Sequence, residues 1–157
     1  MKKLVIAALL ALGLATTPVL AKNSSGVKIG VLSCDVAAGV GVIIASSRTV
    51  DCTFSRTVGG KNERYKGTID RVGLDIGITG KAVMAWVVFA PGKMKRGALA
   101  GSYAGVSAEA SVAVGLGANA LLGGSNKSIA LQPLSVQAQT GLNVAAGVAA
   151  LRLKYVK

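Results

Sequence analysis

Short segments rich in valine and isoleucine, separated by glycine and other turn residues, run through this chain of 157 residues. Such segments are typical of β-strands, and no long stretch repeats its apolar residues at the 3.6-residue period of a helix. We therefore predict an all-β domain with at most one short helix within residues 108–122, where Gly115 and Gly117 oppose a longer one. The predicted strands are 27–35, 40–45, 49–55, 64–72, 75–79, 82–89, 99–104, 108–114, 118–122, 128–131, 134–140, 142–149 and 150–155.

Residues 1–21 have the layout of a cleavable signal peptide. Lys2 and Lys3 precede an apolar run over residues 4–14, and small residues lead to Ala21, which is the order of regions in a secretory signal. The apolar core of about 11 residues is shorter than the roughly 20 that a membrane-spanning helix needs. We expect cleavage near Ala21, a periplasmic or secreted location, and a single β-rich domain over residues 22–157.

The two cysteines, Cys34 and Cys52, constrain how the strands are arranged. In an oxidising compartment such a pair is expected to form a disulfide, which requires Cα atoms within about 7 Å. A flat meander of strands 27–35, 40–45 and 49–55 would place the cysteines two strands apart, at roughly 9.5 Å. The meander and the disulfide therefore exclude each other. We predict a closed antiparallel β-sandwich or barrel.

Two further patterns bear on the fold. Residues 83–89 are continuously apolar, which indicates a strand buried on both faces or facing lipid, and we favour burial because no aromatic girdle flanks them. Residues 43–50 resemble residues 121–129, each interpreted as a hairpin tip with one cation, and residues 72–76 resemble 140–144. This similarity suggests a two-fold internal repeat, and the alternative is chance resemblance among strands of simple composition.

The balance of charge is strongly basic, with 18 lysines and arginines, six acids and a net charge of +12. This excess favours contact with anionic surfaces such as lipid or polysaccharide, although net charge also serves solubility. Nucleic acid is not expected as a partner, because export and the scarcity of aromatic residues for base stacking both oppose it. The candidate anion-binding residues form three clusters, which we assign to loops: Lys61, Arg64 and Lys66; Lys93, Lys95 and Arg96; and Arg152 and Lys154.

The sequence carries no recognisable catalytic motif and no histidine, which removes the commonest general base and the commonest metal ligand. Asp35 and Asp51 each adjoin a cysteine, so the disulfide would bring them together, and close carboxylates share a proton or recruit a cation. The favoured alternative is exposure to solvent or pairing with Arg48 or Arg56.

Glu109 is the only acid after Asp75. We expect it to form a structural pair with Lys127 or Arg152, and the alternative is that it lines a pocket. With these assignments we predict no catalytic residue, no cofactor and no metal site. The protein is expected not to be an enzyme, and its oligomeric state is left open.

Five segments resemble a bacterial family catalogued as domain of unknown function 992: residues 30–36, 63–65, 73–77, 105–111 and 123–136. The resemblance covers nearly all of residues 27–153, and its Leu-Gln-Pro-Leu-Ser-Val string is fairly specific. It implies a small exported protein of Gram-negative bacteria with no assigned activity, so no catalytic residues are carried over. Residues 105–111 are also remotely similar to SYLF-type lipid-binding domains.

Two functional hypotheses follow from these observations. The first is a cell-envelope protein that contacts anionic lipid or polysaccharide through its basic loops. The second is a β-barrel that binds a small hydrophobic ligand in the periplasm, within an interior lined by glycine and alanine.

Overall fold

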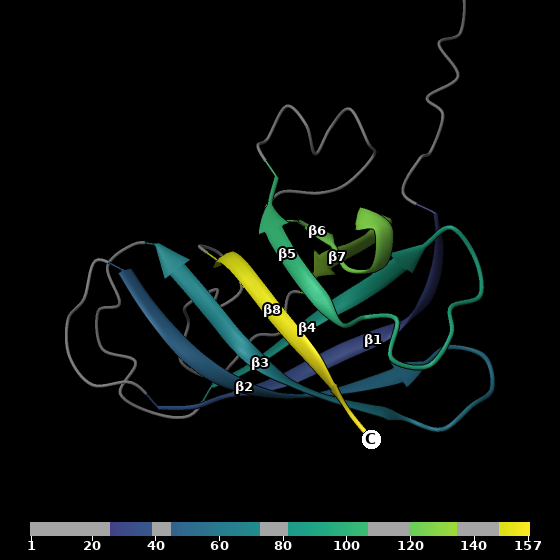
Figure 1. Cartoon of the computed structure of the whole chain (residues 1–157), viewed down its shortest axis with the longest axis horizontal. Coiled ribbons are helices and arrows are strands. Elements are labelled where there is room, and N and C mark those ends of the chain that lie inside the picture. The colour runs from purple at the N-terminus through teal and green to yellow at the C-terminus, as the bar shows by residue number, and fades with distance from the viewer. Residues whose placement is uncertain (1–25, 39–44, 73–81, 107–119, 135–147) are drawn as a thin grey trace, which may run out of the picture.

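The computed structural model describes residues 26–38, 45–72, 82–106, 120–134 and 148–157. These residues form antiparallel strands and one turn of 3-10 helix (Figure 1). The strands are β1 (Val27–Val36), β2 (Ala45–Arg56), β3 (Glu63–Val72), β4 (Ala82–Ala90), β5 (Gly101–Gly105), β6 (Leu121–Gly123), β7 (Ile129–Pro133) and β8 (Val148–Val156), and the 3-10 turn η1 is Ser125–Lys127.

The strands close into one barrel in the order β1-β2-β3-β8-β5-β6-β7-β4, with β4 pairing back onto β1. Each pairing is antiparallel. Strand β8 lies between β3 and β5, and β4 lies between β7 and β1, so the chain does not simply wind up and down. Because the barrel is closed, each described strand is paired on both sides, which removes the exposed edges of an open sheet. The prediction of a closed antiparallel β-fold is confirmed.

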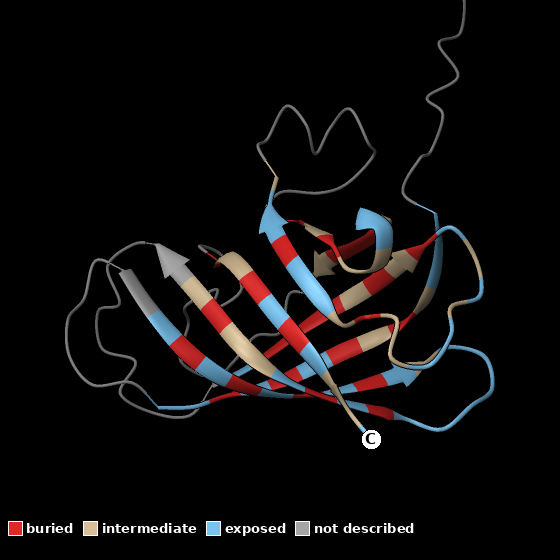
Figure 2. Ribbon diagram, in the orientation of Figure 1, coloured by how far each residue is buried: buried red, intermediate tan, exposed pale blue. Residues whose placement is uncertain are grey.

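Buried and exposed residues alternate along the strands, most visibly along β2 and β8 (Figure 2). This period of two directs alternate side chains into the barrel. An eight-stranded barrel is just wide enough for its interior to be filled by side chains. Large residues fill it here, including the fully buried Trp86, Tyr65, Tyr103, Phe54, Leu32, Leu121 and Leu151.

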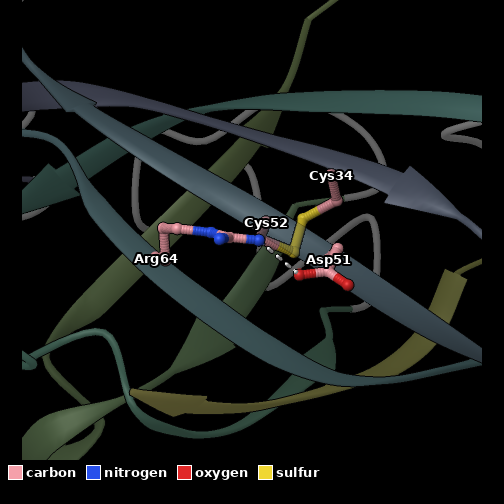
Figure 3. Close-up of a disulfide and its surroundings, with 4 residues drawn as sticks. All are labelled: Cys34, Asp51, Cys52 and Arg64. Atoms are coloured by element: carbon pink, nitrogen blue, oxygen red, sulfur yellow. Dashed lines mark hydrogen bonds and ion pairs between the residues drawn. A yellow bond between two sulfur atoms is a disulfide. The ribbon is translucent and has the colours of Figure 1, made fainter. Parts of the chain in front are cut away.

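The disulfide Cys34–Cys52 joins β1 to β2 from inside the barrel, where both cysteines are buried (Figure 3). The two residues are direct cross-strand partners with Cα atoms 4.0 Å apart. The expected strand 40–45 therefore does not separate them. Of that range only Ala45 is described, and it begins β2. The prediction of closure is correct, but its premise is wrong, because β1 and β2 are neighbours.

The internal repeat is not supported at its first copy. Residues 121–129 do form a hairpin tip, from β6 through η1 into β7. The matching Arg48, however, lies within β2 and is buried on the inner side of the barrel rather than at a turn. A similar string of small and hydroxyl residues thus adopts two structures, because pairing with β1 and β3 extends the first into a strand. Residues 73–81 and 135–147 lie outside the described part.

The apolar segment 83–89 forms most of β4, and its burial is only partly as expected. Met84, Trp86 and Val88 point inward and are buried. On the outer face Ala85 is 8% exposed, whereas Val83 is half exposed. Phe89 packs against a small outer cluster that includes Ala130. The outer face is therefore covered in part, by neighbours from β6 and β7.

Removing the disulfide with the double substitution Cys34→Ala and Cys52→Ala should lower the free energy of unfolding by about 3 kcal/mol. The bond closes a sequence separation of 18 residues, and its loss restores freedom to the unfolded chain. Urea unfolding of the oxidised protein and the variant measures the difference. The protein reduced while unfolded is the control, and it should match the variant. Equal unfolding free energies for the oxidised protein and the variant would contradict the prediction.

Candidate functional site

A groove of about 850 Å³ lies at the end of the barrel where β2 and β4 finish. Residues from the β2–β3 and β4–β5 connections and the start of β1 line it. In Figure 1 these two connections lie together on the right-hand side of the barrel. The lining residues include no acid and six bases: Lys28, Arg56, Lys61, Lys93, Lys95 and Arg96.

The β2–β3 connection, residues 57–62, projects as a short loop. The Thr57 N–H donates to the Ile29 carbonyl at 3.0 Å and so continues the pairing of β1 with β2 beyond the end of β2. Gly59 and Gly60 then turn the chain with φ angles of 51° and 110°, a region that other residues rarely adopt. Val58 stands at the tip with 86% of its surface exposed.

The β4–β5 connection, residues 91–100, is fastened to the barrel at several points. Leu99 is fully buried, and Met94 packs partly against the core. Its anchoring hydrogen bonds run from Arg56 Nη1 to the Met94 carbonyl at 3.2 Å, from the Gly97 N–H to Glu63 Oε2 at 2.9 Å, from Ser125 Oγ to the Ala98 carbonyl at 2.9 Å and from Tyr103 Oη to the Leu99 carbonyl at 2.8 Å.

Glu63, the first residue of β3, is the centre of these contacts, and its side chain is fully buried. Its Oε1 accepts from Nε of Arg56 at 3.1 Å and also from Nη2 of the same guanidinium. Its Oε2 accepts from the Tyr65 hydroxyl at 2.6 Å and from the Gly97 N–H at 2.9 Å. Both oxygens are thus satisfied by charged or well-aligned donors, which makes burial of the carboxylate tolerable.

The protonation states of this network favour the arrangement. Burial acts to raise the pKa of Glu63, but hydrogen bonds from Tyr65, Gly97 and Arg56 outweigh it and hold this pKa below its ordinary value. Burial and the neighbouring carboxylate raise the pKa of Tyr65 well above its ordinary value. At neutral pH Glu63 is therefore an anion and Tyr65 a protonated donor.

Basic side chains stand next to these anchored positions. Lys93, Lys95 and Arg96 are exposed, whereas the backbone at Met94 and Gly97 is held. Glu63 balances the charge of Arg56, but in the described part of the chain no ion pair joins the other five lining bases to an acid. Like charges held around a concave surface raise its positive potential and attract anions.

The remaining candidate anion-binding residues lie elsewhere, on the outer wall of β3 and β8 rather than in loops. Lys66 and Lys154 are direct cross-strand partners, and both are exposed. Arg64 pairs with Asp51 at 3.3 Å, and Arg152 pairs with Asp70 at 2.8 Å. These exposed pairs contribute little to stability, but they offset half of the positive charge of the wall.

Asp35 and Asp51 are direct cross-strand partners beside the disulfide, as predicted. They lie on the outer side of the barrel, and Asp51 bonds Arg64 on the neighbouring strand (Figure 3). Both acids are exposed, as the favoured alternative expected, but the partners it named are wrong, because Arg56 bonds Glu63 and Arg48 is buried inside the barrel. Among the described residues no group of three potential metal ligands is present.

Three further expectations concern Glu109, the lining of the barrel interior and membrane-spanning helices. Glu109 lies outside the described residues, and Arg152, one of its expected partners, bonds Asp70. The barrel interior is lined by aromatic and branched side chains rather than by the expected glycine and alanine. In the described part, no helix is long and apolar enough to span a membrane.

The sequence pattern predicted Lys61, Lys93, Lys95 and Arg96 as candidate anion-binding residues, and in the structure these four residues line one groove. It did not place Lys28 or Arg56 at a binding surface, and it gave Glu63 no role. A signal for Glu63 does exist, because Glu63 and Tyr65 are two residues apart at the start of a strand and so share a face. An acid on the apolar face of a strand requires a buried donor.

A closed eight-stranded antiparallel barrel with a cationic groove at one end is thus the class of protein that the chain defines. The sequence model of a family described as a protein of unknown function, DUF992, matches residues 14–154, and the chain belongs to this family. Neither a curated protein nor a solved structure matches the chain. The similarity to SYLF-type domains stays a prediction, since most of residues 105–111 lie outside the described part.

Replacing Glu63 by glutamine should lower the free energy of unfolding at pH 7 by about 3 kcal/mol, because the Arg56 side chain, which is only 17% exposed, would lose the counter-ion of its charge. The matched control is Asp70→Asn, which breaks the exposed pair with Arg152 and should cost less than about 1 kcal/mol. Urea unfolding measures both.

The pH dependence of stability gives a second readout of the same change. The folded pKa of Glu63 is lowered, so its contribution is present above the unfolded value of about 4.3 and is lost as pH falls through the folded pKa. The free energy of unfolding of the wild type should therefore fall more than that of Glu63→Gln between about pH 5 and about pH 3, the interval around the unfolded and folded pKa values of Glu63. Parallel losses in the two proteins would contradict the role given to Glu63.

Proposed function

We propose that this protein is an exported, non-enzymatic protein of the cell envelope that binds anionic lipid or polysaccharide surfaces through the cationic groove. The observation that carries the proposal is the convergence of six bases, without an acid, on one groove at the end of the barrel. A neutral or mixed lining would not discriminate between anionic and neutral surfaces.

The fastening of residues 91–100 supports this proposal. Flexible basic loops lose freedom when they bind, and that loss weakens binding. Here the backbone between the basic side chains is already held by Arg56 and Glu63. The loop that carries the cations is therefore partly ordered before binding, so less conformational entropy is lost when it binds.

Export is supported by the charged and apolar pattern of residues 1–21 and by the disulfide. Disulfides persist in oxidising compartments and are rare in the cytosol. The proposal of a non-enzymatic role is supported by the sequence, which has no histidine. It is also supported by Glu63, the buried acid at the groove, whose two oxygens are fully engaged with protein donors.

Export predicts a processed chain that begins at Lys22. Expression of residues 1–157 in a Gram-negative host, followed by intact-mass measurement of the periplasmic and secreted fractions, tests this. The mass should match residues 22–157 with both cysteines oxidised. Recovery of the unprocessed chain from the cytosol alone would contradict export.

Binding is tested by co-sedimentation of the exported protein with vesicles of phosphatidylcholine, with and without phosphatidylglycerol, and with an immobilised anionic polysaccharide. Binding should be confined to anionic surfaces and should be lost in about 1 M salt, where screening acts within about 3 Å. Lys93→Gln with Lys95→Gln should lower the partition coefficient roughly 30-fold, at about 1 kcal/mol for each cation.

The matched control removes the same two charges from the outer wall, as Lys66→Gln with Lys154→Gln. Because these residues lie away from the groove, the control should lower the partition coefficient by no more than about threefold. That change reflects only the weaker long-range attraction between the net charge of the protein and the surface. Equal losses from the two double variants would indicate non-specific attraction. No binding to any anionic surface would overturn the proposal.

A further inference from the structure

We infer that the surface bound at the groove is a lipid bilayer, which the barrel meets end-on with Val58 inserted below the phosphates. The inference rests on the proposed function and deepens it by choosing lipid over polysaccharide. It comes from the exposed apolar side chain of Val58 at the groove, which attraction between charges does not explain.

Exposed apolar residues are concentrated at this groove. Among the described residues only Val27, Val58 and Val83 are large hydrophobic residues classed as exposed, and Val27 and Val58 line the groove. Val58 is the most exposed of the three, at 86%. It stands on the same short loop as Lys61, across the groove from Lys93 and Lys95.

The tip of the loop is shaped to project. No atom of the described residues lies within 4 Å of the position that a Cβ on Gly59 would take, and the adjacent Val58 is itself 86% exposed, so neither residue of the tip packs against the barrel. The loop is short and is tied at its base by the Thr57 bond to Ile29. Val58 is therefore held away from the barrel, and it belongs to neither apolar cluster of the described residues.

An apolar tip beside a ring of cations matches the chemistry of a bilayer interface. Cations interact with lipid phosphates, whereas apolar side chains gain stability at the boundary between headgroups and acyl chains. A polysaccharide or a soluble polyanion offers the charges but no apolar layer. With such a partner Val58 would stay in water, and changing it would have no effect on binding.

Fluorescence of a Val58→Trp variant tests insertion. Trp86 is the only native tryptophan and is fully buried, so it gives a constant background. Val83→Trp is the matched control, because Val83 is also exposed but lies outside the groove, towards the other end of β4. With vesicles that contain phosphatidylglycerol, the emission of Val58→Trp should move to shorter wavelength, and that of Val83→Trp should not.

A second variant, Val58→Ser, keeps every charge. It should lower the partition coefficient for anionic vesicles roughly tenfold, as expected when one buried valine is lost. Its binding to inorganic polyphosphate should equal that of the wild type. Because residue 58 is at an exposed loop tip, the thermal unfolding midpoint should be unchanged, and this is checked for all three variants.

The outcomes separate the inference from the function on which it rests. If Val58→Trp shows no shift while the protein still binds anionic vesicles, insertion is wrong and the cationic groove stands. If the shift also occurs with polyphosphate, or if Val58→Ser weakens both ligands equally, the preference for lipid is wrong. If vesicles and polyphosphate both fail to bind, the proposed function and the inference fail together.

Discussion

A buried carboxylate at the mouth of the barrel holds together the part of the molecule that carries its charge. Glu63 begins β3, bonds the guanidinium at the end of β2 and accepts a backbone N–H from the β4–β5 connection. Without it, Arg56 would keep a partly buried charge with no counter-ion, and Gly97 would lose its acceptor. Because each donor is needed to offset the burial of the anion, the fold and the groove depend on the same contacts.

The strand β2 is held from both sides, and this explains how the groove keeps its shape. The disulfide joins β2 to β1 in the wall, and the Glu63–Arg56 pair joins its end to β3. The start of β1 and the β2–β3 loop both line the groove. A covalent bond and a buried ion pair thus fix the relative positions of two of its three contributing segments, whereas hydrogen bonds hold the third.

Within the described residues, local pattern located most of the strands, but it did not indicate which strands are neighbours. The segments 27–35 and 82–89 were placed to within a residue at each end, because β-branched periodicity is a local property. The disulfide Cys34–Cys52 was predicted correctly, but its two strands were not expected to be neighbours, whereas β1 and β2 pair directly and Ala45 already belongs to β2. Glu63 was overlooked because its donors at Arg56 and Gly97 are seven and 34 residues away in sequence. Such contacts depend on which segments the fold brings side by side, which a local pattern does not show.

Net charge alone does not locate a binding surface, and the two basic regions of this barrel show why. On the outer wall the pairing of β2, β3 and β8 places Asp51 near Arg64 and Asp70 near Arg152, so acids from neighbouring strands offset the cations. At the end of the barrel four of the six groove bases come from connections, and no acid is among the described residues that line the groove. Glu63, the acid that bonds Arg56 at this end, points inward and is fully buried. In the sheet, neighbouring strands place acids beside bases. At the groove, the basic side chains other than Arg56 remain without acidic partners among the described residues, and they lie beside the exposed Val58.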